Sequence, residues 1–346
     1  MPSSDPPPSL GRAYWTGLLA MLTPVSIVVA FNVLTDPTGE FGQSGRYAFN
    51  RSPPQAVLAR GRAGGNPAFH TRALRETGAT RFLVGASRTS FGFDTCGRPD
   101  VLKVAGAAWA TPEYRQALKL ILAGRRDPVG VYFEVGMPTT TPPVVGDPLR
   151  AAVSAALSPR TTLDGVRTIA HSLSSRGTAP AYVACIGSAR APDWPAADLL
   201  ARQATALLDL SSEALKRDER ELLRIADLAD ATCARAGVRH EVVFYALPSS
   251  PATALTAAQS DLFDRHARRL ARVFADRAAA PEGCRILFVD LANHPPGGPD
   301  GPGSWQERRH WNDHTHFSPR LGAYALEALL DAPHPVDADP SGRTAA

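Results

Sequence analysis

Residues suited to nucleophilic catalysis occur at two distant places in this chain. Ser87 follows a short apolar run and the small residues Gly85-Ala86, while Asp313 and His316 lie three residues apart near the other end. A serine nucleophile needs an imidazole as general base and usually a carboxylate that orients the imidazole. We therefore predict that folding assembles a triad of Ser87, His316 and Asp313.

Alternating apolar runs and helical patterns predict the sheet that would position these groups. The strand candidates are short and largely apolar, as strands buried on both faces should be: 81–84, 101–104, 130–135, 241–247 and 285–291. Helical patterns lie between and after them, at 112–123, 198–236, 257–278 and 323–330. We expect the second of these to break near Ser211-Ser212, which can cap a helix.

This alternation indicates an α/β fold with a parallel sheet and helices on both faces. Open sheets of this kind bind ligands at the carboxyl ends of their strands, and a serine just after the first strand projects from that edge. The 346 residues, 44% of them hydrophobic, suffice for a large core. A net charge of only +4, with no lysine–arginine block, argues against a nucleic-acid partner.

Residues 14–34 carry no charged side chain and are long enough, as a helix of about 20 residues, to cross roughly 30 Å of hydrocarbon. Tyr14 and Trp15 suit a membrane interface, and Arg12 is consistent with a positive N-terminal side. A cleaved signal peptide is the alternative, but its apolar part is usually about 7–15 residues long. Val28-Val-Ala30 is a poor cleavage site, so we expect an uncleaved transmembrane anchor.

The remaining regions are defined by composition. We expect disorder in 1–13 and 332–346, an extended lead-in over 35–80 and the α/β domain over 81–331. Within that domain, 139–197 shows no strand pattern and is expected to be a helical insertion covering the carboxyl edge of the sheet. The chain has four cysteines, none of them in a Cys-x-x-Cys pair: Cys96, Cys185, Cys233 and Cys284. They could form one or two disulfides or remain four buried thiols, and the sequence does not distinguish these alternatives.

A Gly-x-Ser after the first strand and an Asp-x-x-His before the last helix resemble the pattern of the SGNH (GDSL-type) hydrolase superfamily. The anchor, the Asp36-Pro-Thr-Gly-Glu-Phe motif and the Gly85-Ala-Ser-Arg88 motif resemble its membrane-anchored bacterial branch. That branch includes relatives of the alginate O-acetylation and lipoteichoic-acid alanylation proteins. The resemblance implies a three-layer flavodoxin-like fold and chemistry that needs no cofactor.

The resemblance also assigns roles to residues. Ser87 would be the nucleophile, His316 the base and Asp313 the carboxylate that orients it, with the Ser87 amide and that of Gly106 holding the oxyanion. Two features depart from the family pattern: Ala86 replaces an aspartate, and Glu134-Val-Gly-Met-Pro stands where a Gly-x-Asn-Asp block is expected. Arg88 would either supply a positive group to the oxyanion or pair with Glu134.

Each of these residues also has an ordinary structural interpretation. A Gly-x-Ser turn is often only a turn, and Gly106 can be present simply because a turn needs it. Asp313 can cap the segment before residue 317, and His316 can be a core imidazole. Arg88 and Glu134 can be a structural ion pair at a strand end.

The resemblance implies a serine esterase or O-acyltransferase of the bacterial inner membrane, single-pass, with its main domain in the periplasm. It would act on a cell-envelope carbohydrate through an acyl-serine, with a membrane-bound acyl-transfer protein as its partner. An inactive scaffold that binds polysaccharide or partner proteins is the alternative. Five residues near the C-terminal end are of types that bind zinc: His294, His310, Asp313, His314 and His316. Their spacing is not that of a helical His-Glu-x-x-His pair, so we do not expect a zinc site.

Overall fold

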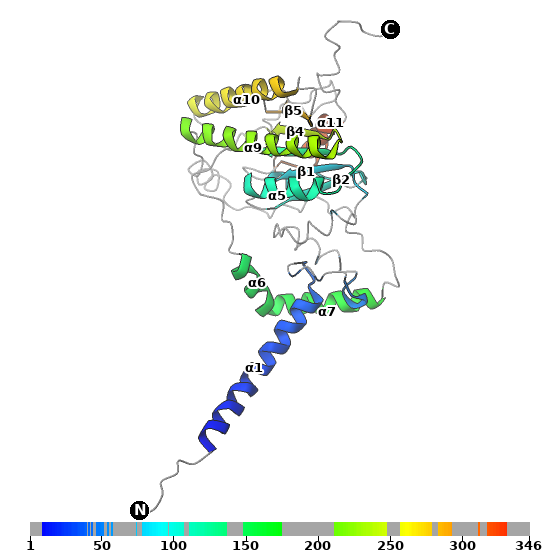
Figure 1. Ribbon diagram of the computed structural model, residues 1–346, viewed down its shortest axis with the longest axis vertical. Coiled ribbons are helices and arrows are strands. Elements are labelled where there is room, and N and C mark those ends of the chain that lie inside the picture. Colours follow the sequence, from blue (N-terminus) through cyan, green and yellow to red (C-terminus); the bar gives the residue numbers. More distant parts are fainter. Residues whose placement is uncertain are drawn as a thin grey trace, which may run out of the picture. The chain divides into compact units, whose positions relative to one another are not determined.

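The computed structural model describes residues 9–39, 41, 43, 46–51, 54, 57, 74, 78–95, 97–106, 111–136, 148–174, 211–247, 257–278, 283–292, 311 and 317–330 (Figure 1). They form two compact units. One contains the N-terminal helix α1 with α6 and α7, and the other contains the sheet and the helices packed on it.

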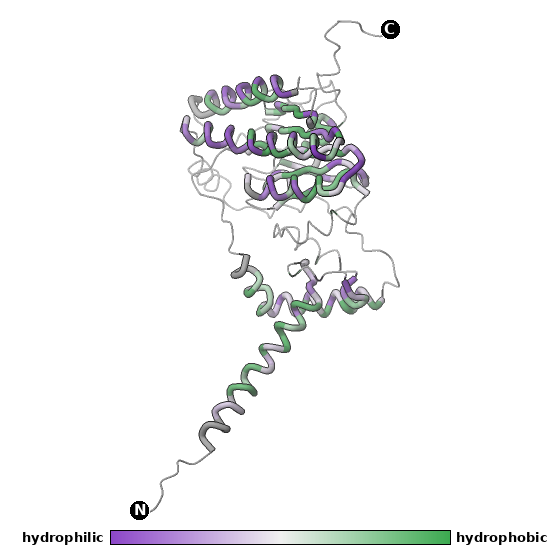
Figure 2. The backbone as a smooth tube through the Cα atoms, in the orientation of Figure 1, coloured by the Kyte–Doolittle hydropathy of each residue, from purple (hydrophilic) through white to green (hydrophobic). Residues whose placement is uncertain are grey.

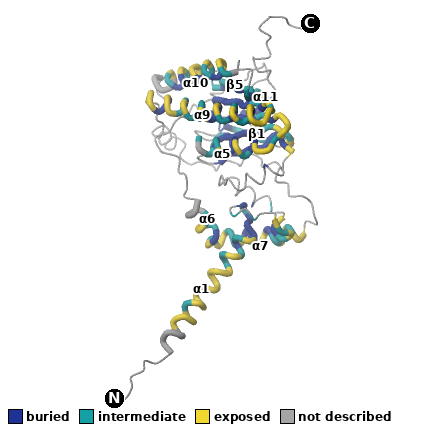
Figure 3. The backbone as a smooth tube through the Cα atoms, viewed as in Figure 1, coloured by how far each residue is buried: buried dark blue, intermediate teal, exposed yellow. Residues whose placement is uncertain are grey.

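The sheet has five parallel strands in the order β2-β1-β3-β4-β5. Their bounds are β1 Arg81–Gly85, β2 Val101–Ala105, β3 Gly130–Val135, β4 Glu241–Ala246 and β5 Arg285–Asp290. Each predicted strand is present, and the prediction of a parallel α/β sheet is confirmed. The strands β1 to β4 are almost wholly buried, which explains why their sequences are nearly continuous apolar runs (Figure 3).

Helices cover both faces of this sheet. The helices α5 (Thr111–Leu122), α9 (Ser212–Ala236) and α10 (Ala257–Ala278) share one hydrophobic cluster with one face of the strands. On the other face lies α11 (Pro319–Leu330), whose leucines join Phe93, Trp311 and Phe317 in a second cluster. The short helix α4 (Ser87–Gly92) directly follows β1 and leads to Phe93. This helix was not predicted, because six residues are too few to show a helical period.

The helix α9 begins where the serines predicted the start of a helix. Ser211 caps α9 by accepting a hydrogen bond from the Ala214 amide at 3.2 Å, which confirms the predicted cap, whereas 198–210 lie outside the described residues. At the other end of α9, Cys233 forms a disulfide with Cys284, the residue before β5. The sequence left this pairing open. Cys96 and Cys185 lie outside the described residues.

The helical unit consists of α1 (Ser9–Thr35), the 3-10 turn η1 (Ala48–Asn50), α6 (Pro148–Leu157) and α7 (Pro159–Ser174). From Tyr14 to Thr35, α1 is long and apolar enough to cross a membrane, and the helix begins earlier than the expected start at Tyr14. Two helices are described within the segment 139–197, for which a helical insertion was predicted; both belong to the unit of α1 and contact that helix. An amphipathic pattern shows that a helix has a partner but not which partner.

The lead-in after α1 is folded locally where it is described. The Asp36 carboxylate accepts hydrogen bonds from the amides of Phe41 at 3.1 Å and Gln43 at 2.7 Å. The Asn50 side chain donates to the carbonyls of Leu34 and Gln43. These contacts turn the chain back toward the end of α1, where a plain extended segment was predicted.

Candidate active site

The turn between β1 and α4 places Ser87 at the carboxyl edge of the sheet. Ser87 is the first residue of α4, separated from β1 only by Ala86. A Cβ atom at Gly85 would lie 2.0 Å from Thr89 Oγ1 and 2.7 Å from Glu134 Oε2. Only glycine fits at this position, so the glycine of the Gly-x-Ser motif is required by packing against these two side chains.

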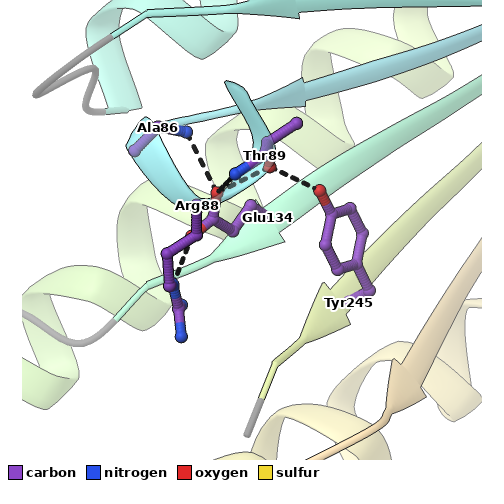
Figure 4. Close-up of polar contacts among 5 residues, drawn as sticks. All are labelled: Ala86, Arg88, Thr89, Glu134 and Tyr245. Carbon is purple, nitrogen blue, oxygen red and sulfur yellow. Dashed lines mark hydrogen bonds and ion pairs between the residues drawn. The ribbon is translucent and has the colours of Figure 1, made fainter. Parts of the chain in front are cut away.

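Glu134, the fifth residue of β3, holds this turn from the neighbouring strand (Figure 4). Its Oε2 accepts hydrogen bonds from the Ala86 amide at 3.0 Å, the Thr89 amide at 3.2 Å and Thr89 Oγ1 at 2.6 Å. Its Oε1 accepts from Arg88 Nε at 2.8 Å. The carboxylate therefore binds the residues on both sides of Ser87 and caps α4, whose own N-cap residue, Ala86, has no side chain that can do so.

The carboxylate stays charged although it is buried. Burial alone would raise the pKa of Glu134, but the charge of Arg88 and the hydrogen bonds from Thr89, Arg88 and Ala86 outweigh it and lower the pKa. Arg88 and Glu134 are an ion pair whose side chains are 12% and 2% exposed. Of the two roles predicted for Arg88, the structure shows this pairing.

A tyrosine from the next strand extends the network. Thr89 Oγ1 lies 2.7 Å from the hydroxyl of Tyr245 in β4. Burial, and then the charge of Glu134, raise the pKa of Tyr245 well above the ordinary value. Because Thr89 gives its own proton to Glu134, the neutral phenol of Tyr245 donates to Thr89. Three adjacent strands, β1, β3 and β4, are thus linked through polar groups at one edge.

Ser87 itself takes no part in this network. Its side chain is partly exposed, and neither its hydroxyl nor its amide has a hydrogen-bond partner among the described residues. The Gly106 amide differs from expectation: it donates to the Gly85 carbonyl at 3.3 Å, continuing the ladder between β1 and β2. This amide is already used, so its predicted role in holding an oxyanion is not supported.

The far end of α4 is also fixed. The buried Lys103 in β2 donates from Nζ to the carbonyls of Ser90 at 3.1 Å and Phe93 at 2.6 Å, where α4 ends. The ring of Phe317 packs so closely here that a Cβ atom on Gly92 would lie 2.3 Å from it. Both ends of a helix of six residues, about 9 Å long, are therefore held by side chains from other elements.

The predicted Asp313 and His316 lie outside the described residues, but the residues that flank them are described. Trp311 and Phe317 form an antiparallel bridge, so the chain leaves residue 311 and returns at residue 317 at one place. Phe317 contacts Phe93, with ring centroids 5.3 Å apart. The described residues Trp311 and Phe317 thus lie side by side, and Phe317 packs on Phe93 at the end of α4, the helix that begins with Ser87.

The histidines weighed as zinc ligands, His294, His310 and His314, also lie outside the described residues. Among the residues that are described, no group of three or more His, Cys, Asp or Glu side chains is placed to hold a metal ion.

A depression of about 660 Å³ lies at the opposite edge of the sheet, lined by residues at the amino ends of the strands, such as Gly130. Two of its arginines are paired, Arg81 with Asp100 and Arg285 with Glu241, each at 3.3 Å. Open parallel sheets bind ligands at their carboxyl edge. We therefore place the candidate site at Ser87 and not in this depression.

Comparison with known proteins gives no family: no family model matches the chain, and no curated protein is similar to it in sequence. The site is therefore defined by its geometry, a partly exposed serine on a turn fixed by the buried Glu134 and its ion-pair partner Arg88. Sequence reasoning found Ser87, Arg88 and Glu134 but missed Thr89 and Tyr245. Tyr245 could have been predicted as a site residue, because it is a polar side chain near the carboxyl end of a predicted strand.

Proposed function

We propose that the chain is a membrane-anchored serine acyl-ester hydrolase or O-acyltransferase of the SGNH-like type. The strand order β2-β1-β3-β4-β5 is that of flavodoxin-like doubly wound sheets, which bind ligands where the order reverses, outside the ends of the first and third strands. Ser87 and Glu134 stand at the ends of these two strands.

One observation carries the proposal. A serine hydroxyl without a partner among the described residues begins α4, and the residues that flank Asp313 and His316 pack at the other end of that helix. Phe317, which directly follows the predicted base, therefore packs at the end of the short helix that begins with the predicted nucleophile. A triad requires that a nucleophile and a base far apart in sequence meet in space, and this packing supports such a meeting.

In the proposed reaction, His316 takes the proton of the Ser87 hydroxyl while Oγ attacks the acyl carbonyl, and Asp313 orients the imidazole. The Ser87 amide donates to the oxyanion. The alcohol leaves with the proton from His316, and the acyl group remains on Ser87. Water or a sugar hydroxyl then gives its proton to His316 and attacks the acyl-serine, and His316 returns the proton to Ser87 Oγ as the acid or the new ester is released. Because Arg88 neutralises Glu134, the oxyanion forms beside a pair of no net charge.

Two features favour an exported site of action. The helix α1 is long and apolar enough to cross a membrane. The Cys233–Cys284 disulfide is of a kind that persists in oxidising compartments. We therefore propose a protein of the bacterial inner membrane, with its sheet unit in the periplasm, acting on a cell-envelope carbohydrate. A membrane-bound acyl-transfer protein would be the partner that delivers the acyl group.

The experiment is turnover of a small aryl acetate by the full-length chain in detergent, comparing wild type with Ser87→Ala. Ser90→Ala is the matched control, because Ser90 lies on the same helix but is buried. We expect Ser87→Ala to lower the rate by about 10⁴ and Ser90→Ala to change it only slightly. Labelling by a fluorophosphonate should map to Ser87 and be lost in His316→Ala. Equal rates for wild type and Ser87→Ala would refute the proposal.

A second candidate function, an inactive scaffold that binds polysaccharide or partner proteins, is favoured by one observation. The Gly106 amide is engaged with Gly85 and Arg88 is engaged with Glu134, so the Ser87 amide alone remains of the predicted oxyanion donors. Loss of a single such donor typically costs about 10²–10³ in rate. Absence of turnover and of fluorophosphonate labelling, together with retained polysaccharide binding by Ser87→Ala, would establish the scaffold.

A further inference from the structure

The helices α6 and α7 expose an apolar surface that the unit of α1 does not cover (Figures 2 and 3). We call these six exposed side chains the apolar stripe: Val153 and Leu157 on α6, and Leu163, Val166, Ala170 and Leu173 on α7. Their spacing of three or four residues within each helix places them on one face of that helix. Val166 is 52% exposed and Leu173 is 69% exposed, values unusual for such side chains in a packed helix pair.

The opposite side of α7 is packed tightly against α1. Asp164, Gly165 and Thr168 are buried. A Cβ atom at Gly165 would lie 2.6 Å from Thr35 Oγ1 and 2.8 Å from the ring of Phe31, both on α1. Because this contact leaves no space for a side chain, the rotation of α7 about its axis is fixed and the apolar stripe is held away from α1.

The α6–α7 pair joins α1 where its apolar run ends. Most of α1 up to Ile27 is exposed, whereas Asn32 and Thr35 are buried, and Asn32 Nδ2 donates to the carbonyl of Ala156 at the end of α6. From Tyr14, about 20 helical residues, or roughly 30 Å, lead to this level, which matches the hydrocarbon thickness of a bilayer. The pair therefore lies at the depth where α1 would leave the hydrocarbon.

Positive charge borders the apolar stripe. Arg160 and Arg167 are seven residues apart on α7, so they lie on the same side of the helix, next to the stripe, and both are exposed. Arg167 also pairs through Nη1 with the buried Asp164 at 3.4 Å, but its side chain is still 54% exposed. An apolar face flanked by arginines is typical of helices that lie in the membrane interface and contact anionic headgroups.

From these observations we propose that α6 and α7 lie in the interface of the bilayer that α1 crosses. The apolar stripe contacts the upper acyl chains, and Arg160 and Arg167 contact lipid phosphates. This inference rests on the membrane-spanning role of α1 in the proposed function. We name lipid rather than a protein as the occupant because the stripe belongs to the same unit as the exposed apolar surface of α1 and lies at its membrane-exit level.

The test measures depth in the bilayer. A single cysteine is placed in the full-length chain, with Cys96 and Cys185 replaced by serine and the Cys233–Cys284 disulfide kept. A nitroxide is attached at Val166→Cys, at Leu22→Cys in the middle of α1, or at Lys216→Cys, an exposed control site on α9. The protein is reconstituted in vesicles of phosphatidylethanolamine and phosphatidylglycerol, and collisions with oxygen and with a water-soluble nickel chelate are compared.

We expect the label at position 166 to be at least several-fold less accessible to the nickel chelate than the label at position 216, and more accessible to oxygen. The label at position 22 should collide often with oxygen and rarely with the chelate, as expected for a site at the bilayer centre. If position 22 is deep and position 166 is as accessible to the chelate as position 216, the inference is wrong while α1 still crosses the membrane. Shielding of position 166 from both reagents would indicate a protein partner and would also overturn it. If position 22 is itself accessible to the chelate, the membrane-spanning role of α1 fails.

Discussion

Replacing Glu134 by glutamine tests the network that fixes the β1–α4 turn. Glu134 offers two acceptor oxygens to four donor contacts, three on Oε2 and one on Oε1. A glutamine amide has only one acceptor oxygen. Turned toward Ala86 and Thr89, it keeps the three contacts on that side and presents its NH₂ group to Arg88 Nε, which is also a donor.

The cost follows from the contact that is lost. A hydrogen bond to a charged group contributes about 1.5–3 kcal/mol, and here a nearly buried arginine also loses its counter-charge. We expect Glu134→Gln to lower the free energy of unfolding of the sheet unit by about 2–3 kcal/mol at pH 7. The matched control is Glu241→Gln, a carboxylate on β4 that accepts from Arg285 and from the Tyr132 hydroxyl and is 23% exposed. A pair exposed to that degree is expected to contribute less than about 1 kcal/mol.

The difference between wild type and Glu134→Gln should depend on pH. Because the pKa of Glu134 is lowered in the folded protein, its stabilising effect is complete above the ordinary glutamate pKa of about 4.3 and is lost as the pH falls through the folded pKa. Urea unfolding of the full-length chain, followed by tryptophan fluorescence at pH 7 and at lower pH, measures this. Equal urea midpoints at pH 7, or a gap that widens toward acid pH, would refute the reasoning.

The remaining predictions concern stability at two other places. Cys233→Ser removes a disulfide that spans 51 residues. The chain-entropy relation gives a loss of about 4 kcal/mol in the free energy of unfolding, which should appear as a lower urea midpoint under oxidising conditions. An unchanged midpoint would contradict the pairing with Cys284. Gly92→Ala forces a Cβ atom against the Phe317 ring and should destabilise the chain by about 1–3 kcal/mol, whereas Gly136→Ala, which meets nothing within 4 Å, should change the midpoint little. If the two alanine variants behave alike, the close packing of α4 on Phe317 is wrong.

The elements of the fold could be predicted from the sequence because their signals are local. Strands buried on both faces are continuous apolar runs, so 130–135 coincides with β3 and 241–247 contains β4. The start of α9 at Ser211 was visible because a capping serine acts on an amide three residues later. The apolar length of α1 was likewise visible within one segment. Ser87 was found because it lies two residues after the end of the first strand.

The contacts that shape the site depended on the tertiary structure. Glu134 meets Ala86 and Thr89 across a sequence separation of more than forty residues, and Tyr245 meets Thr89 across 156. Local periodicity shows which residues are buried but not which strand ends become neighbours, and that is decided by the order β2-β1-β3-β4-β5. For the same reason the sequence did not reveal that the Gly106 amide is used by the sheet, that α6 and α7 pack on α1, or which cysteine pairs with Cys233.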